Sequence, residues 1–278
     1  MQKLKLSGGM LVFLGAAFWS LNSPLVKFLT LDSYLICGLR SAIAAVALAA
    51  LIRPKQLKWN GWMLLYVCSY AALSLSVISA LTMTSAPIAV GMQYTATIWL
   101  FLINLIVTRK FKLRAFIPVC VILTGVALFM CSSTDATSAQ GNLIALSEGI
   151  FFTGLTLGAK KAAGTNSVGL TGIANAFTAV VVFLLFPQAG AALPTLTGQD
   201  WFVMLILGVV QVGGGYAFYT LGVQRTTPQK ASIIALWEMI LGPVWVALFL
   251  KEYPSPMVLA GFAIVLAGIV LDSTINTD

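Results

Sequence analysis

The sequence predicts an all-α polytopic membrane protein, with ten transmembrane helices arranged as two inverted five-helix repeats around a central cavity. Composition is the first reason, because 59% of the 278 residues are hydrophobic and only 9% are charged. A soluble domain of this length cannot bury so much apolar surface. Length is the second reason, because a helix needs about 20 apolar residues to cross the hydrocarbon core and the chain supplies about ten such runs. We therefore expect a lipid bilayer to surround most of the chain.

An internal repeat is the third reason. Residues 87–128 reappear in altered form at 228–271, and each copy consists of a proline, an apolar run, a short charged turn and a second apolar run. The turns are Arg-Lys-Phe at 109–111 and Lys-Glu-Tyr at 251–253, so the copies are offset by about 141 to about 143 residues. That offset is half of the chain.

A second similarity supports the first, because 16–20 followed by Lys27 resembles 149–153 followed by Lys160. The predicted domains are two five-helix repeats, residues 1–136 and 137–278.

The expected spans follow from the apolar runs in order. They are residues 8–28, 33–52, 59–81, 87–108, 113–132, 141–163, 167–186, 201–223, 228–250 and 255–272. Lys3 and Lys5 precede the first run as they would in a signal peptide. Because nine more runs follow, we interpret this run as a retained first helix.

The net charge of +8 reports topology here, whereas in a soluble protein it would suggest a nucleic-acid partner. If the N-terminus is cytoplasmic, the outer segments carry only Lys27 and Lys251. The inner segments carry Lys3, Lys5, Arg53, Lys55, Lys58, Arg109, Lys110, Lys112, Arg114, Lys160, Lys161, Arg225 and Lys230. The positive-inside rule therefore predicts that both termini are cytoplasmic. We also expect Asp135 on the outer side, and no nucleic-acid partner.

Five spans per repeat place the second half in the opposite orientation to the first. Inverted repeats are typical of secondary transporters, whose substrate sites lie near the midplane between the halves. A channel is the alternative, although ten unlike helices in an inverted repeat favour gating by rocking halves.

The chain contains no histidine, which removes His-based proton relays, His-ligated metals and Ser-His hydrolase chemistry. The four cysteines lack the spacing of a metal site or redox motif, and we interpret them as small packing residues. Glu148 and Glu238 are isolated carboxylates, so an intramembrane enzyme is disfavoured. We expect no catalytic residue, no metal and no cofactor.

The first three spans carry several candidate lining residues. Trp19 and Asn22, with Ser23, lie on one helical face just before Pro24, where they form either a cavity wall or interhelical contacts. In the third span Tyr66, Tyr70 and Ser74 follow at four-residue steps. Tyr66 is expected as an interfacial anchor, whereas Tyr70 and Ser74 are deep enough to line a path.

The second span contains Arg40 near its middle, where a charge costs about 2.5 to 3.5 kcal/mol on insertion scales. We expect one of the two buried carboxylates or backbone carbonyls to satisfy it.

The fourth span carries a polar stripe of Gln93, Thr97 and Asn104, which should face inward. Tyr94 and Trp99 flank it, so the first repeat combines aromatic and amide groups. Such a wall would suit an amphiphilic solute.

The sixth and eighth spans supply candidates from the second repeat. Glu148 precedes two phenylalanines by one turn. Gln211 precedes Gly213-Gly214-Gly215 and Tyr216, where the glycines form either a hinge, a site wall or a tight helix contact.

In the ninth span Trp237 and Glu238 lie near the middle, and Pro243 is expected to kink the helix shortly afterwards. Glu238 is expected to face the cavity, where it receives a substrate ammonium group or exchanges a proton. A protonated glutamate that hydrogen-bonds neighbouring helices is the alternative.

With these motifs in place, the sequence resembles the drug/metabolite transporter superfamily in its ten-helix EamA-type form, and especially the YddG-type exporters of aromatic amino acids. The resemblance rests on the two five-helix halves, their openings at 16–27 and 149–160, and the two charged turns. Lys110 stands where the second copy has Glu252, so no shared role is assigned to that position.

The resemblance implies a multi-pass transporter of a bacterial-type inner (plasma) membrane, exporting aromatic and other neutral amino acids by alternating access. Export of drugs or other metabolites is the competing function, because aromatic walls accept many flat solutes. Its expected partners are the bilayer and a small-molecule substrate, and a monomer suffices for this architecture.

Overall fold

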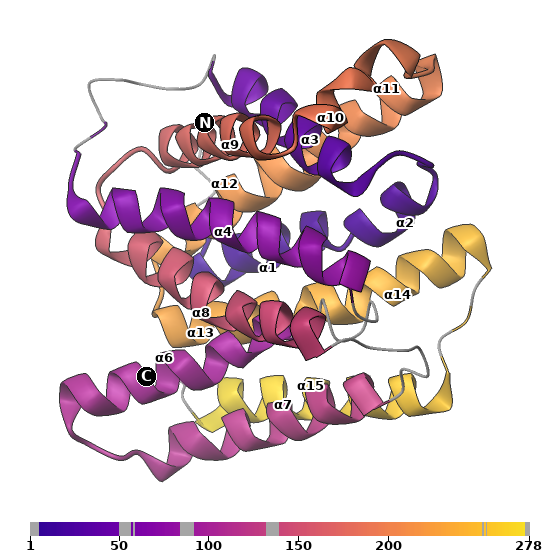
Figure 1. The fold of residues 1–278 in the computed structure, drawn as a ribbon. Helices are drawn as coiled ribbons and strands as arrows, with labels where there is room; N and C mark the ends of the chain where they lie inside the picture. The colour runs from indigo at the N-terminus through magenta and orange to yellow at the C-terminus, as the bar shows by residue number, and fades with distance from the viewer. Residues whose placement is uncertain are drawn as a thin grey trace.

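The computed structural model describes residues 6–49, 57, 59–83, 92–131, 139–251, 253 and 255–275. Throughout these ranges the regular structure is helical (Figure 1). Within these ranges six helices are long and apolar enough to cross a membrane, and four shorter apolar helices occupy the other predicted positions. The predicted class, an all-α polytopic membrane protein, is confirmed. The proline at 87, Asp135, Glu252 and the basic residues at 3, 5, 53, 55 and 58 lie outside the described residues.

The helices of the first predicted repeat lie in chain order. They are α1 (Gly8–Trp19), α2 (Asn22–Lys27), α3 (Ser33–Ala49), α4 (Gly61–Met83), the 3₁₀ turn η2 (Met92–Thr95), α6 (Ala96–Thr108) and α7 (Leu113–Cys131). Those of the second are α8 (Ala139–Lys161), α9 (Ser167–Leu185), α10 (Pro187–Ala191), η3 (Leu193–Thr195), α11 (Gly198–Leu205), the π-helix η4 (Ile206–Gly214), α12 (Gly215–Gln224), α13 (Pro228–Ala235), α14 (Trp237–Leu250) and α15 (Pro256–Ile275).

The first span is interrupted, which corrects the prediction of one continuous helical face. α1 ends at Trp19 and α2 begins at Asn22. Pro24 lies in the first turn of α2, where its missing N–H is tolerated, but it cannot donate to the carbonyl of Ser20. Trp19 and Asn22 therefore lie on two separate helices.

The ninth span is also interrupted, but not where the sequence predicts. α13 and α14 meet at Leu236, and α14 continues past Pro243 to Leu250. The break therefore falls directly before Trp237 and Glu238, which become the first residues of α14. Both residues consequently lie at a helix N-terminus instead of in the middle of a helix.

The eighth span changes its hydrogen-bond pattern along its length. The residues from α11 through η4 to α12 form one rod, of which η4 is a π-helix. Short π segments occur frequently at functional sites. Gln211 lies in this segment.

α7 and α15 lie side by side at the lower edge of the molecule (Figure 1). Gly125 and Gly268 permit this approach, because a Cβ at Gly125 would lie 2.8 Å from the Gly261 carbonyl oxygen, and one at Gly268 would lie 2.6 Å from the Ile122 side chain.

The turns that precede these two helices have the same unusual backbone. Arg109 ends α6 at φ 52° and ψ 24°, and Lys251 ends α14 at φ 57° and ψ 23°, both in the left-handed region. In Figure 1 the α6–α7 turn lies at the left edge and the α14–α15 turn at the right. The two turns therefore lie at opposite ends of the bundle.

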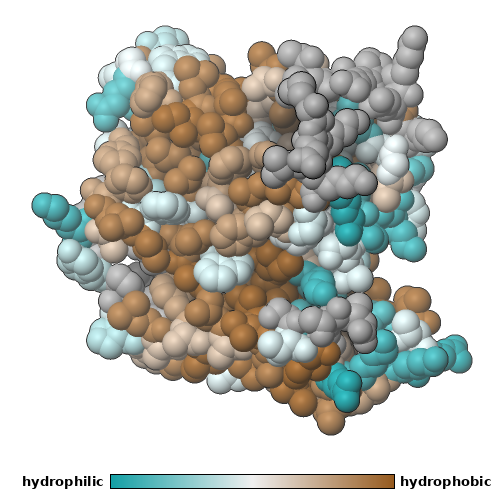
Figure 2. All heavy atoms as spheres, turned by 180° about the vertical axis from the view of Figure 1, so that it is seen from behind, coloured by the Kyte–Doolittle hydropathy of each residue, from teal (hydrophilic) through white to brown (hydrophobic). Residues whose placement is uncertain are grey.

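The surface carries an apolar band between two polar margins. Figure 2 shows hydrophobic side chains across the middle of one face and hydrophilic ones at its left and right edges. Because the helices run approximately from left to right in Figure 1, the margins coincide with helix ends. This pattern suits a protein whose helices cross the hydrocarbon core.

Candidate functional site

Two glycines bring α1 and α12 into contact and thereby place the first aromatic group. A Cβ at Gly15 would lie 2.8 Å from the Gly215 carbonyl oxygen, and a Cβ at Gly215 would lie 2.5 Å from the Trp19 ring. Trp19 consequently packs against Tyr216, with ring centroids 4.5 Å apart, and against Tyr219 at 4.8 Å. The helix contact therefore builds an aromatic wall.

α4 extends this wall from the first repeat. The Tyr70 ring lies edge-on to Tyr216 at 4.5 Å, and its hydroxyl donates to Asn175 Oδ1 at 2.9 Å. Tyr66 is fully buried and its hydroxyl bonds to that of Thr220 at 2.7 Å, so the prediction of an interfacial anchor is wrong.

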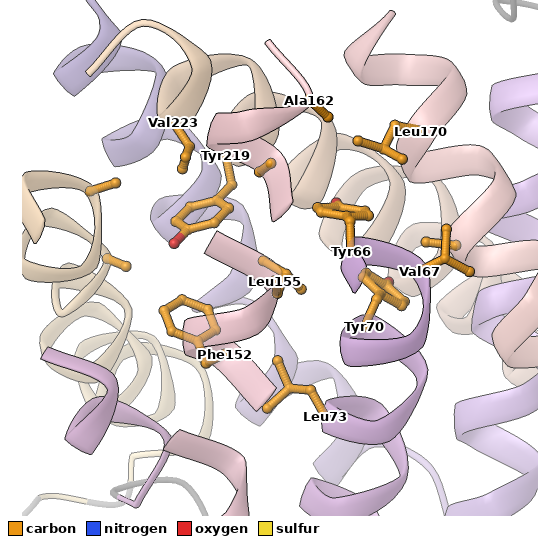
Figure 3. Close-up of a cluster of buried hydrophobic side chains, with 14 of the residues drawn as sticks. Tyr66, Val67, Tyr70, Leu73, Phe152, Leu155, Ala162, Leu170, Tyr219 and Val223 are labelled. Carbon is orange, nitrogen blue, oxygen red and sulfur yellow. The ribbon is translucent and has the colours of Figure 1, made fainter. Parts of the chain in front are cut away.

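The aromatic wall continues onto α8. The centroid of the Phe152 ring lies 6.2 Å from that of Trp19 and 5.5 Å from that of Tyr219. Figure 3 shows Leu155 of the same helix between Tyr219 and the α4 tyrosines. α8 therefore fills the space between helices of both predicted repeats.

The Tyr94–Glu238 contact also joins the two predicted repeats. The Tyr94 hydroxyl donates to Glu238 Oε2 at 3.4 Å, and Glu238 is half-buried. The neighbouring Trp237 lies edge-on to Phe13 of α1 at 5.6 Å. Glu238 therefore faces other helices, as the sequence predicts for an intramembrane carboxylate.

Arg40 projects from α3 into the same region. Its Nη1 donates to Asn22 Oδ1 at 2.8 Å, and the guanidinium lies within electrostatic range of Glu238 and Tyr216. Within the described residues, no carboxylate lies within ion-pairing distance of Arg40. The expectation of a carboxylate or backbone partner is therefore corrected, because the break after α1 turns Asn22 towards α3.

Several buried polar atoms of the candidates have no hydrogen-bond partner among the described residues. They are Trp19 Nε1, Thr97 Oγ1, both carboxyl oxygens of Glu148, and Gln211 Oε1. Glu148 is completely buried, one turn before Phe152 on α8. The Gln211 side-chain amide donates to the Trp19 backbone carbonyl at 3.5 Å, which links these two residues. Buried polar atoms are normally paired, so such a group marks a place for ligand or ordered water.

Other predicted residues lie at the margin of this region. Ser74 is buried, and its carbonyl accepts from the Cys37 thiol at 3.9 Å. Gln93 is half-buried in η2, and Trp99 is half-buried without a ring contact to the aromatic wall among the described residues.

Asn104 is exposed, so the predicted polar stripe does not face inward along its length. Thr97 and Asn104 lie on the same face of α6, but only Thr97 is buried, so this face is no longer covered towards the C-terminal end of the helix. Gln93 lies outside α6, in the 3₁₀ turn η2, which has about three residues per turn.

Sequence reasoning missed two polar residues that position this site. Asn175 holds Tyr70, and Gln229 of α13 donates to the Thr97 carbonyl at 3.4 Å while its own Oε1 is unpaired among the described residues. An amide inside an apolar run was the available signal for Asn175, as it was for Gln93.

These features define a polytopic membrane protein with an aromatic, partly charged interior built by helices from both halves. Residues 139–274 match the model of the EamA-like transporter family, which confirms the predicted EamA resemblance for that part of the chain. The family match indicates a membrane transporter of small molecules.

A solved structure described as "Crystal structure of protein" has the same fold. Its TM-score is 0.79 at 14% sequence identity, and the alignment covers 98% of this chain and 99% of that chain. At this identity the likeness concerns the fold alone. The comparison with curated proteins gave no match.

Proposed function

We propose that the protein is a secondary transporter that exports aromatic and other neutral amino acids by alternating access between the two predicted repeats. One observation carries the proposal. Arg40 of the first repeat and Glu238 of the second are within electrostatic range of each other, but not within ion-pairing distance. An amino acid carries a carboxylate and an ammonium group, so these side chains would contact opposite ends of its zwitterionic head.

The aromatic wall supports the substrate's apolar part. Trp19, Tyr70 and Tyr216 present neighbouring rings from α1, α4 and α12. Aromatic faces pack against apolar solutes and attract ammonium groups by cation–π contacts of about 0.5 to 2 kcal/mol. An aromatic amino acid would use both properties.

The unpaired polar atoms support a ligand with several hydrogen-bond donors. Glu148 and Gln211 contribute acceptor oxygens, and Trp19 contributes one donor. These atoms come from three helices around the aromatic wall, so they would adjust to the substrate as the halves move.

We also propose a bacterial-type inner membrane and cytoplasmic termini. The start of α1 lies against the Arg225 backbone, and Lys160 donates to the Gln224 carbonyl at 3.3 Å, so these basic residues gather at one helix end. Membrane-impermeant thiol labelling of Lys110→Cys from the cytoplasmic side and Lys251→Cys from the outer side tests this topology. The reverse labelling pattern would overturn it.

Export of drugs or other flat metabolites is the second candidate function. The observation in its favour is that the rings of Trp19, Tyr216 and Tyr70 form a contiguous, uncharged surface. Such a wall would bind a planar solute without a zwitterionic head.

A counterflow assay in liposomes separates the two functions. Phenylalanine, phenethylamine and phenylpropanoate share one ring but differ in charge, so wild-type protein should exchange phenylalanine in preference to the other two. Glu238→Gln and Arg40→Gln should each weaken phenylalanine exchange by about ten- to a hundredfold, as expected for a lost hydrogen bond to a charged group.

Matched controls change exposed charges on the α6–α7 turn and the start of α7 instead. Lys112→Gln and Arg114→Gln should leave exchange unchanged, and size-exclusion profiles should show that all four variants fold. Equal exchange of the three solutes by wild-type protein, or unaltered phenylalanine exchange by both site variants, would contradict the amino-acid proposal.

A further inference from the structure

A cavity lies apart from the aromatic wall. Its volume is about 830 Å³, and its lining comes from the end of α3, the α8–α9 turn, η4 and α12. The α12 residues that line it include Ala217, Leu221 and Gln224, at spacings that place them on one face of the helix. Tyr216 and Tyr219 lie on the opposite face, towards Trp19. α12 therefore separates this cavity from the candidate substrate site.

The cavity is long and mainly apolar. It extends along the rod from Val209 to Gln224, a distance of about 20 Å at 1.5 Å per residue. One leaflet of the hydrocarbon core is about 15 Å deep, half of a core of about 30 Å. Val209 is 43% exposed and Phe218 is half-buried, so the lining is not sealed inside the bundle. The groove therefore matches an acyl chain in length and in polarity.

One end of the groove is polar and basic. Gln224 accepts from the Ser167 hydroxyl at 3.0 Å, and its carbonyl accepts from Lys160. Lys161 and Arg225 are exposed next to these residues. The sequence places no acidic residue within 160–168 or 217–225. This end is complementary to an anion at the membrane surface.

We propose that this groove binds one anionic phospholipid, with an acyl chain along η4 and α12 and the phosphate at the end formed by Lys160, Lys161 and Arg225. This lipid site requires only that the chain lies in a membrane, and it does not depend on the transported substrate. None of the predicted substrate-binding residues lines the groove.

Thermal unfolding of delipidated protein in detergent tests the proposal, with dioleoylphosphatidylglycerol and dioleoylphosphatidylcholine as probes. Phosphatidylglycerol should raise the unfolding temperature saturably, and native mass spectrometry should show one retained molecule in preference to phosphatidylcholine. Lys160→Gln should weaken the apparent affinity for phosphatidylglycerol by about fivefold, whereas Lys110→Gln at the distant α6–α7 turn should not.

A space-filling variant tests the groove itself. Ala217→Trp should abolish the saturable rise, while Ala176→Trp at an exposed position of α9 outside the groove should retain it. If Ala217→Trp fails to fold, the wild-type preference for phosphatidylglycerol decides the question. Equal effects of the two lipids, equal behaviour of the two tryptophan variants, or displacement of the lipid by phenylalanine would each overturn the proposal.

Discussion

α4 and the rod formed by α11, η4 and α12 occupy the third position of their respective predicted repeats. They differ in whether their buried polar groups have hydrogen-bond partners. α4 is one uninterrupted helix, and the hydroxyls of Tyr66 and Tyr70 both have partners on the second repeat. The rod changes to a π-helix, and Gln211 within it leaves its Oε1 unpaired among the described residues.

The difference indicates separate tasks for two related positions. A regular helix with satisfied hydroxyls provides a fixed wall, because breaking any of its buried bonds has a cost. A π segment with an unsatisfied amide oxygen has weaker internal constraints and a group available to a ligand. We therefore expect the loss of a buried hydroxyl in α4 to affect stability, and the loss of the Gln211 side chain in the rod to affect transport.

The largest loss of stability is expected when the close contact between Gly215 of α12 and the Trp19 ring is disrupted. Gly215→Val would force a side chain into the Trp19 ring, because even a Cβ there lies 2.5 Å from it. Overpacking of this kind costs about 1–3 kcal/mol, so the unfolding temperature and folded yield should fall. Gly61→Val is the matched control, since nothing lies within 4 Å of a Cβ at Gly61. Equal unfolding temperatures of the two variants would show that α12 does not depend on this contact.

A smaller loss of stability should follow from Tyr70→Phe. The change leaves Asn175 Oδ1 without its donor in a buried site, which costs about 1–3 kcal/mol. The ring remains beside Tyr216, so substrate affinity measured by counterflow should stay within about twofold of wild type. A selective loss of affinity at unchanged unfolding temperature would place the Tyr70 hydroxyl in the site and abolish the contrast between α4 and the rod.

Small gains in stability should follow at the two left-handed turn residues. Arg109→Gly and Lys251→Gly remove a side chain from a φ of 52° or 57°, and each should stabilise the protein by up to about 1 kcal/mol. Lys110→Gly next to the first turn is the control and should bring no gain. Thermal unfolding measures both gains. Unequal gains would show that the two turns differ in their surroundings although their dihedral angles are similar.

The smallest effect on stability is expected from Gln211→Leu. This variant loses a 3.5 Å bond to the Trp19 carbonyl but also removes an unpaired buried oxygen, so the unfolding free energy should change by less than about 0.5 kcal/mol. Substrate affinity should nevertheless fall by up to about tenfold. Unchanged affinity in correctly folded protein would make the π segment a packing feature and would remove its role in the site.

The sequence is informative about the positions of helices and much less about their interruptions. The predicted spans 113–132 and 167–186 agree with α7 (Leu113–Cys131) and α9 (Ser167–Leu185), because apolar length and polar boundaries determine where a helix can cross. The break at Ser20 has only Pro24 as a local signal, and the break at Leu236 and the π-helix η4 lack any comparable one. They depend on which backbone groups find partners in neighbouring helices, and hydrophobic periodicity does not contain that information.

The residue types of the candidate site were predictable from the sequence, but which of these residues contact each other was not. Deep polar and aromatic residues such as Tyr94 and Glu238 are conspicuous in an apolar chain, and the structure places these two in contact. The Arg40–Asn22 bond was missed because it depends on the turn of the chain after Trp19. Charge alone had suggested a carboxylate as its partner.

The π-helix η4 contains one more residue between its hydrogen-bonded groups than an α-helix of the same pitch would hold. Deletion of a single residue in this segment would restore α-helical bonding and leave α11 and α12 in the same relative orientation, because a π turn absorbs its extra residue locally. Deletion of a residue from a regular α-helix would instead turn everything that follows by about 100°. In evolutionary terms, the gain or loss of one codon in this segment can be accommodated while Tyr216 keeps its place against Trp19.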